Sequence, residues 1–171
     1  MMKPVKFQTT WGTITLTLNG GKVVALDLPH LKNTPRKPFK AKVSKVRKNE
    51  TEFFQGLEKK FPGIGPPDGT EFQRSVWNEL KKIPRGQTRT YGEIATAIGR
   101  PKAVRAVGSA CGENPLPVFI PCHRVIAKNG LGGFGSGLPW KKLLLRMEGW
   151  SNGEILRTLR NEKDDVKAGH D

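Results

Sequence analysis

Strict alternation of apolar and polar residues marks the start of the chain. Residues 13–18 read Thr-Ile-Thr-Leu-Thr-Leu, which is the period of a strand with one buried face. The following Asn-Gly-Gly at 19–21 is typical of a tight turn, so residues 22–28 return as a second strand, and residues 5–10 supply a third. The pattern predicts a small antiparallel sheet.

A helix is predicted after a basic, proline-broken segment. Residues 29–48 contain eight Lys or Arg and no acidic residue, which favours a loop. Asn49 and Glu52 then form a capping pair for a helix that runs to about Lys60. The Pro- and Gly-rich run at 62–69 follows, and it indicates a domain boundary.

Helical periodicity dominates the chain after this boundary. Capping pairs begin two helices: Thr70 with Gln73 begins the first, and Thr90 with Glu93 begins a shorter one that Gly99 ends. A further helix is expected from Lys102. Two short helices joined by a tight turn predict a helix-turn-helix unit, for which an ordinary helical hairpin is the alternative.

Shorter elements are expected toward the C-terminus. Residues 125–131, with Asn-Gly in the middle, predict a hairpin, and the Gly-rich run 132–137 predicts a loop that approaches a ligand closely. A helix is expected over 141–148. The segment 151–171 is expected to be a partly disordered tail with one weak helix after Ser151.

Net charge narrows the choice of partners. Thirty basic and fifteen acidic residues give +15, and the excess is spread over both halves of the chain. A polyanion is the expected partner, nucleic acid before a membrane surface, although a generally basic soluble surface remains the alternative. No apolar run is long enough to cross a membrane, and the N-terminus lacks the apolar core of a signal peptide. We therefore expect a cytoplasmic protein, or a nuclear one in a eukaryote.

The chain has two cysteines, Cys111 and Cys122, and three scattered histidines. This is too few cysteines for a secreted disulfide scaffold, and no Cys/His cluster has the spacing of a zinc site. We expect no metal and no other cofactor.

The strongest chemical candidate is Pro121-Cys122-His123. A thiolate is a nucleophile, and a base close to it increases the ionised fraction. Sequence neighbours in a strand point to opposite sides, so a turn set by Pro121 is needed to bring both side chains to one site. A buried structural cysteine is the alternative that these residues alone leave open.

Six short segments carry a resemblance to a known family. They are Phe72-Gln73 with Val76-Trp77, Thr90 to Ala95, Arg105 to Gly108, Asn114-Pro115, Ile120 to Val125, and Lys141 with Leu144-Leu145 and Glu148-Gly149. In this order they resemble the O6-alkylguanine-DNA alkyltransferases over about residues 70–149, while residues 1–68 fit by pattern only. The resemblance implies an α+β fold. A small N-terminal antiparallel-sheet, ribonuclease H-like domain (1–68) precedes a winged helix-turn-helix catalytic domain (69–150) and the tail (151–171).

The resemblance also implies a mechanism. Cys122 would take the alkyl group from a flipped O6-alkylguanine, and from O4-alkylthymine, in one irreversible turnover. His123 would act on Cys122 through a water, with Glu148 orienting the imidazole. Tyr91 would donate a proton toward the base, and Asn114 would hold the active-site turn.

Further residues would contact the substrate. Pro117, the Val125 carbonyl and Ser136 would line the lesion pocket, and Arg105 would fill the gap in the base stack. DNA contacts are also implied for Thr90, Ala103 and Ser109. The partner would be double-stranded DNA with an alkylated guanine, bound by a monomer that needs no protein partner and no membrane.

Three other classes of protein compete with this interpretation. A non-catalytic binder of alkylated DNA with the same fold would lack the cysteine. A Cys-His acyl-transfer enzyme would need an oxyanion hole and would turn over repeatedly. A plain transcription regulator would leave Cys122, His123 and Glu148 unexplained together. The sequence also departs from some family members, since Phe134 is the nearest aromatic residue to the loop where they have a tyrosine.

Overall fold

The computed structural model describes residues 1–9, 11–31, 50–61, 63–151, 153–155 and 157–158. Its first part is the predicted meander of β1 (Met2–Thr9), β2 (Gly12–Asn19) and β3 (Lys22–Asp27), paired antiparallel in that order. A register shift lies between Thr17 and Leu18 in the pairing of β2 with β3. The alternating pattern places Ile14 and Leu16 of β2 in the core, as the period of two requires.

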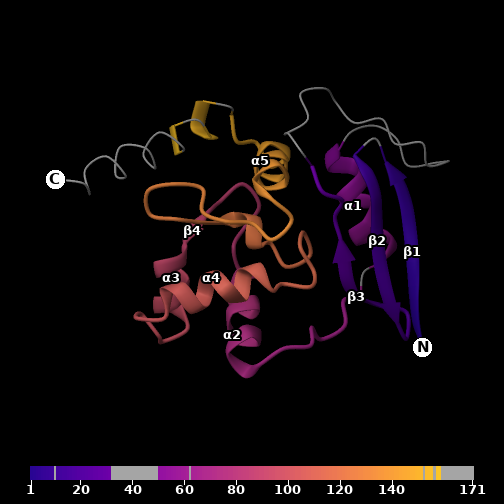
Figure 1. Cartoon of the computed structure of the whole chain (residues 1–171), viewed down its shortest axis with the longest axis horizontal. Coiled ribbons are helices and arrows are strands. Elements are labelled where there is room, and N and C mark those ends of the chain that lie inside the picture. The colour runs from indigo at the N-terminus through magenta and orange to yellow at the C-terminus, as the bar shows by residue number, and fades with distance from the viewer. Residues whose placement is uncertain (10, 32–49, 62, 152, 156, 159–171) are drawn as a thin grey trace.

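Helix α1 (Glu50–Lys60) packs next to this sheet (Figure 1). Its Phe54 stacks on Trp11, which lies in the turn between β1 and β2, with ring centroids 6.3 Å apart. Trp11 also meets Trp140 edge to face at 5.0 Å, so one aromatic cluster joins the sheet to the far end of the chain. Most of the predicted 29–48 loop, from residue 32 on, and Asn49 of the predicted capping pair lie outside the described residues.

The Pro- and Gly-rich segment after α1 runs beside the sheet. Val23 N donates to Gly63 O at 3.0 Å, Gly65 N donates to Val23 O at 2.8 Å, and Ile64 forms a parallel bridge with Val23. The segment therefore covers part of the free edge of β3.

Three helices form the next part: α2 (Glu71–Leu80), α3 (Tyr91–Ala97) and α4 (Val104–Gly112). Both predicted capping boxes, at Thr70 and at Thr90, are confirmed. Helix α4 begins at Val104 rather than at the predicted Lys102, because residues 101 and 102 belong to the turn that precedes it. The Trp77 indole of α2 donates to the Ala110 carbonyl of α4 at 2.8 Å, which fixes these two helices against each other.

The hairpin predicted over 125–131 is wrong in its pairing. Strand β5 (Val125–Ile126) pairs in parallel with β4 (Arg89–Thr90), and the Asn-Gly turn is closed by an isolated bridge between Ala127 and Gly130. A turn at Asn129-Gly130 was predicted correctly, but the strand that pairs with β5 comes from a distant part of the chain.

Helix α5 (Leu138–Met147) begins three residues earlier than expected, because Pro139 suits the first turn of a helix. After it, Ser151 and Glu154 form the predicted capping pair, and Ile155 packs with Leu131 and Leu145 in a second small core. Within the described residues, no helix has the length and apolar character needed to cross a membrane.

Candidate active site

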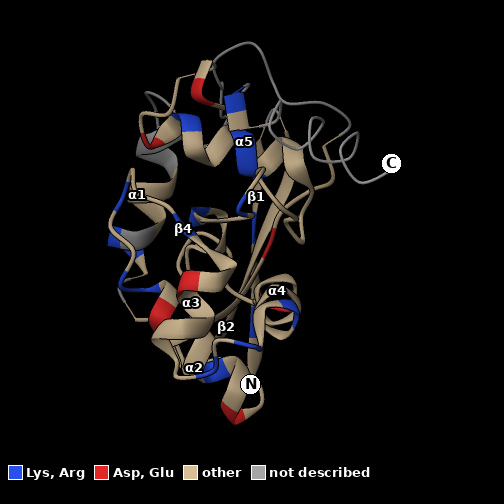
Figure 2. Cartoon of the chain, turned by 90° about the vertical axis from the view of Figure 1, so that its left-hand side faces the viewer, with Lys and Arg blue, Asp and Glu red and all other residues tan. Residues whose placement is uncertain are grey.

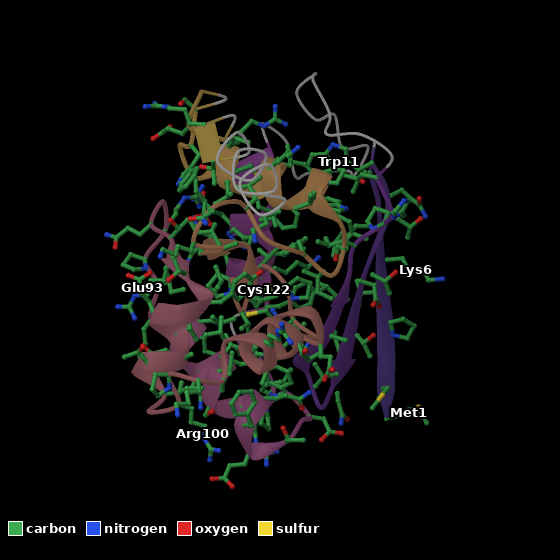
Figure 3. All side chains as sticks on the ribbon, turned by 60° about the vertical axis from the view of Figure 1, so that its left-hand side comes forward. Met1, Lys6, Trp11, Glu93, Arg100 and Cys122 are labelled. Atoms are coloured by element: carbon green, nitrogen blue, oxygen red, sulfur yellow. The ribbon has the colours of Figure 1, made fainter. Side chains whose placement is uncertain are left out.

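Cys122 lies in the interior of the molecule, whereas the labelled Glu93 and Arg100 lie at its edge (Figure 3). It opens a short 3-10 turn, η1 (Cys122–Arg124), which follows an apolar loop from the end of α4. Asn114 organises this loop. Its Oδ1 accepts from Leu116 N at 3.0 Å, and its Nδ2 donates to Ile120 O at 2.8 Å and to Cys122 Sγ at 3.1 Å.

The same loop holds backbone strain. Val118 has φ +78°, and among the described non-glycine residues it alone has a positive φ. A β-branched residue in this region costs on the order of 1–3 kcal/mol, which surrounding contacts must offset. The Asn114 hydrogen bonds and the buried Leu116 and Ile120 supply such contacts on both sides of Val118.

His123 and Arg124, the last two residues of η1, both bind Glu148, which caps the C-terminus of α5. His123 Nε2 lies 2.7 Å from Glu148 Oε1, and the Arg124 guanidinium donates to the same carboxylate at 2.8–3.1 Å. Gly86 N donates to Glu148 Oε2 at 3.0 Å, and Arg124 also donates to the Ile83 carbonyl at 2.7 Å. The Glu148 carboxylate is thus held by three residues, His123, Arg124 and Gly86, from two parts of the chain.

These contacts fix the protonation state of His123. Burial alone would raise the pKa of Glu148, but the hydrogen bonds from His123 and Arg124 outweigh it and lower the pKa to about 2. An ionised carboxylate only accepts, so Nε2 of His123 carries the hydrogen. Burial lowers the pKa of His123 despite Glu148, so the imidazole is neutral and its lone pair is on Nδ1.

Nδ1 is the basic nitrogen of the site. It is buried, and no described residue provides it with a hydrogen-bond partner. The structure also contains no direct hydrogen bond between the His123 ring and Cys122 Sγ among the described contacts. A proton passing from the thiol to Nδ1 therefore needs an intermediate carrier.

The thiol itself is protonated in this state. Burial raises the pKa of Cys122 to about 11, and the hydrogen bond from Asn114 and the charge of Lys141 offset this only in part. At pH 7 only about one thiol in ten thousand is then ionised. The sequence led us to expect a thiol activated by its neighbours, whereas this structure shows a nucleophile kept latent by burial.

Lys141 is fully buried and binds backbone carbonyls next to the site. Its Nζ donates to Val125 O at 2.6 Å and to Gly133 O at 3.0 Å, and it lies 5.9 Å from the centre of the Tyr91 ring. The carbonyls compensate for the lost water, and the charge favours a thiolate at Cys122.

Tyr91 and the Gly-rich loop pack on each other. The Tyr91 hydroxyl donates to Gly133 O at 3.3 Å, and burial raises the pKa of Tyr91 to about 12, so the phenol is a proton donor at neutral pH. A Cβ on Gly132 would lie 2.7 Å from the Tyr91 ring, and φ there is +66°. Glycine at this position is required for contact between the loop and Tyr91.

Two cavities meet at Cys122. One, of about 510 Å³, is lined by Tyr91, Arg105 and Gly108 of α3 and α4, and it lies on the helix-turn-helix side. The other, of about 490 Å³, lies on the side of the N-terminal sheet and includes Asn114, Pro117 and Ser136. Both are also lined by Cys111, Gly112, Cys122, Phe134 and Gly135.

Six of the predicted site residues line one or both of these cavities: Tyr91, Arg105, Asn114, Pro117, Cys122 and Ser136. His123 and Glu148 line a separate, smaller pocket. Val125, whose carbonyl accepts the Lys141 bond, and the predicted DNA contacts Thr90, Ala103 and Ser109 line neither of the two cavities. The Thr90 hydroxyl is engaged as the cap of α3. On α4, Val104, Arg105 and Ala106 are exposed while Val107, Ala110 and Cys111 are buried.

Basic residues do not gather on one element. In Figure 2, Lys and Arg occur on α4, on α5 and on several connecting segments. The described residues contain no group of three or more His, Cys, Asp or Glu that could hold a metal ion.

Comparison with known proteins gives this geometry a context. A probable methylated-DNA–protein-cysteine methyltransferase of Acanthamoeba polyphaga mimivirus is 39% identical over 150 residues, which cover 86% of this chain and 97% of that protein. The chain belongs to the methylated-DNA–protein-cysteine methyltransferase family. The family model described as the DNA-binding domain of 6-O-methylguanine DNA methyltransferase matches residues 71–150.

Other members of the methyltransferase family are also similar to this chain in sequence and in structure. The Methanosarcina acetivorans protein is 58% identical over 98 residues, 57% of this chain, and the match spans 63% of that relative. The crystal structure of Mycobacterium tuberculosis OGT in complex with DNA has a TM-score of 0.65 at 34% identity, and the match covers 85% of this chain and 92% of that one. The α+β fold, with an N-terminal sheet and a C-terminal helical DNA-binding domain, is thereby confirmed.

Two charged residues of this methyltransferase site were not assigned a role from the sequence. Arg124 and Lys141 both lie in segments that carried the resemblance, but charge alone favours an exposed position. One signal was available for Lys141: it lies three and four positions before Leu144 and Leu145, on an apolar face of α5. For Arg124 no such signal existed, because its partners Glu148 and Ile83 are distant in sequence.

Proposed function

We propose that this protein repairs double-stranded DNA by transferring the alkyl group of O6-alkylguanine, and of O4-alkylthymine, irreversibly to Cys122. One observation carries the proposal: the cysteine lies where two cavities meet and is followed by a histidine whose basic nitrogen, Nδ1, has no hydrogen-bond partner among the described residues. Membership in the family, and the helix-turn-helix side of one cavity, support DNA as the substrate.

The chemistry balances without a cofactor. Sγ attacks the alkyl carbon, the bond from that carbon to O6 breaks, and its electron pair stays on the guanine. The thiol proton passes through a water to Nδ1 of His123, while Glu148 holds the ring. The Tyr91 phenol donates a proton toward the leaving base, so the guanine departs neutral, and the proton held by His123 restores the phenol through water.

The raised pKa of Cys122 suits a protein that can react only once. A protonated thiol reacts slowly with unrelated electrophiles, because the thiolate is the nucleophile. In this proposal the thiolate forms when the substrate is in place. The product is a thioether, which has no proton left to lose and no route back to a thiol here.

Base flipping is required because the alkyl carbon attached to O6 of a stacked guanine cannot reach a buried thiol. We propose that α4 enters the groove and that its exposed Arg105 fills the space left by the base, with Thr90, Ala103 and Ser109 near the DNA backbone. All groups in this scheme come from one chain, which supports action as a monomer.

The decisive experiment uses duplex DNA that contains O6-methylguanine. We expect methyl transfer to plateau at one lesion per protein, with the methyl on the Cys122 peptide by mass spectrometry and none on the Cys111 peptide. A folded Cys122→Ala variant should bind the duplex and transfer nothing. Repeated turnover would instead support the acyl-transfer type of cysteine enzyme, and transfer in the Cys122→Ala variant would disprove the proposed nucleophile.

A further inference from the structure

Arg124 binds the same carboxylate oxygen as the imidazole. Glu148 Oε1 lies 2.7 Å from His123 Nε2, and it also accepts from Arg124 Nη2 at 2.8 Å and from Nε at 3.1 Å. The other oxygen, Oε2, accepts from Arg124 Nε at 3.0 Å and from Gly86 N at 3.0 Å. The guanidinium and the imidazole therefore share one carboxylate, and each weakens the hold of that carboxylate on the other.

The guanidinium is fixed in this position. Its remaining nitrogen, Nη1, donates to Ile83 O at 2.7 Å, so all three nitrogens are engaged. The Arg124 side chain is 16% exposed, and those of Glu148 and His123 are 7% and 2% exposed. Water screens charges at this depth only weakly, so the three groups act strongly on one another.

The charges of these three residues decide where a proton resides. The Arg124 guanidinium and the Glu148 carboxylate cancel, and a neutral His123 adds no charge, so the resting trio is neutral. A proton on His123 leaves an uncompensated positive charge in a buried place, which is costly. Without the guanidinium, the remaining pair carries one negative charge, and a proton on the imidazole neutralises it.

A second cation acts in the same direction. Burial lowers the pKa of His123, the hydrogen bond and the charge of Glu148 raise it, and the charges of Arg124 and Lys141 lower it further. Lys141 donates to backbone carbonyls, whereas Arg124 is hydrogen-bonded to the carboxylate that orients the imidazole. Arg124 thus sets how much of Glu148 is available to His123.

The other elements around the imidazole bring no second anion. Helix α1 contributes uncharged side chains, those of Phe54 and Gln55, to the small pocket beside it. Arg85 lines this pocket too, but its guanidinium donates to the backbone carbonyl of residue 147 at 2.7 Å. The neighbouring thiol is protonated, because burial raises its pKa to about 11. Among the described residues that line the pocket, Glu148 is the only anion.

We propose that Arg124 is a positioning residue of the proton relay: by sharing Glu148 with His123, it keeps the imidazole free to receive the thiol proton and able to pass it on. Arg124 acts through Glu148 and does not touch the substrate. The proton leaves Sγ as the bond from sulfur to carbon forms, is held on Nδ1, and then passes through water to the phenolate of Tyr91. This inference rests on the proposed function and adds a residue to its relay.

The test follows the reaction of Cys122 with the free base O6-benzylguanine at pH 6 and pH 8, which removes any effect of Arg124 on DNA affinity. Arg124→Gln keeps hydrogen-bond donors and removes the charge, so the pKa of His123 rises and the imidazole rests protonated at low pH. We expect its rate, relative to the unmodified protein at the same pH, to be about tenfold lower at pH 6 than at pH 8, since one unit of pKa is a factor of ten.

Two further variants separate charge from structure. Arg124→Lys keeps the charge but loses the planar fork, so its relative rate should be lower by the same factor at both pH values. Arg85→Gln removes a guanidinium from the same pocket without touching the carboxylate, and its relative rate should stay near one. A deficit of Arg124→Gln that is equal at pH 6 and pH 8, or a deficit of Arg124→Lys that grows at low pH, would overturn the inference.

Nitrogen-15 NMR of the His123 ring gives a readout that needs no alkyl transfer. In the unmodified protein the ring should be neutral at pH 6.5, the ordinary pKa of histidine, and in Arg124→Gln it should be protonated there. A protonated ring in the unmodified protein would overturn the inference even where Arg124→Gln does not fold. Absence of alkyl transfer by the unmodified protein would overturn the proposed function instead, while the NMR titration still tests the effect of Arg124 on His123.

Discussion

Cys122 and His123 are neighbours in sequence, yet they lie in opposite environments. We call Cys122 and the two cavities around it the sulfur face, and His123 with Arg124 and Glu148 the imidazole face. On the sulfur face the Asn114 amide donates to Sγ, and burial raises the pKa of the Cys122 thiol to about 11. On the imidazole face Glu148 binds both His123 and Arg124, and the pKa of Glu148 is lowered to about 2, so this carboxyl stays ionised.

The difference shows that within one turn, η1, the reactive thiol and the residues that hold the backbone in place are on separate sides. The imidazole face orders the backbone of η1 and fixes a neutral tautomer, while the sulfur face is left with space for a substrate. Each of the following predictions changes one face and asks whether the other responds.

The largest effect is expected from pH on the sulfur face. The rate of alkylation of Cys122 by iodoacetamide in the free protein should rise about tenfold per pH unit between pH 7 and 10, because thiolate is the reactive form and its pKa is raised. The total change is about a thousandfold. The measurement is the rate of label incorporation at Cys122, with the urea-unfolded protein levelling off near the ordinary pKa of 9.0 as reference. A plateau below pH 8 in the folded protein would show that the thiol is not latent.

A change on the imidazole face comes next. Glu148→Gln should slow methyl transfer from O6-methylguanine DNA by about a hundredfold, because the imidazole loses the carboxylate that orients it and stabilises its protonated form. Glu71→Gln, on an exposed turn of α2, is the matched control and should react normally. If a folded Glu148→Gln variant keeps its rate, the two faces act independently and the relay is wrong.

The same variant tests the acid stability of the fold. The pKa of Glu148 is lowered from 4.5 to about 2, so its ionised form stabilises the folded state above pH 4.5, and this contribution is lost as the pH falls to about 2. The size is about 3 kcal/mol. In Glu148→Gln, the free energy of unfolding by urea should therefore fall less between pH 5 and pH 2.5 than in the unmodified protein.

Lys141→Met removes a buried charge that acts on both Cys122 and His123. We expect the free energy of unfolding to fall by about 2 kcal/mol, since two carbonyls lose their donor, and the pKa of Cys122 to rise further. Lys142→Met, at the next and half-buried position, is the control and should change neither quantity. Unfolding in urea and the pH profile of alkylation measure the two effects. An unchanged profile would mean that Lys141 serves the fold alone.

The smallest effect concerns Arg105, which adjoins the sulfur face only through a cavity. Arg105→Ala should slow repair of duplex DNA about tenfold, because a planar guanidinium no longer replaces the flipped base. The reaction of Cys122 with the free base O6-benzylguanine needs no flipping and should be nearly unchanged. Arg157→Ala, on the exposed tail, controls for loss of charge. Equal slowing of both reactions would assign Arg105 to the chemistry instead of to flipping.

Local patterns predicted the elements well where neighbours in sequence decide them. The alternation over 13–18 became β2, and the capping pairs at Thr70 and Thr90 began α2 and α3. The hairpin over 125–131 was wrong because the partner of β5 is β4, more than thirty residues earlier. The roles assigned to individual site residues, the domain boundaries and the monomeric state stay predictions.

The sequence by itself determined the chemistry that is available: one Pro-Cys-His turn, a basic chain, and a succession of motifs that resemble one family. Those features depend on residue type and order alone. The tertiary structure decided how reactive that chemistry is. Burial keeps the thiol of Cys122 protonated, Glu148 and Arg124 select the tautomer of His123, and β3 closes a cavity beside the sulfur. Each of these depends on solvent exclusion and on contacts between distant segments, which no local pattern encodes.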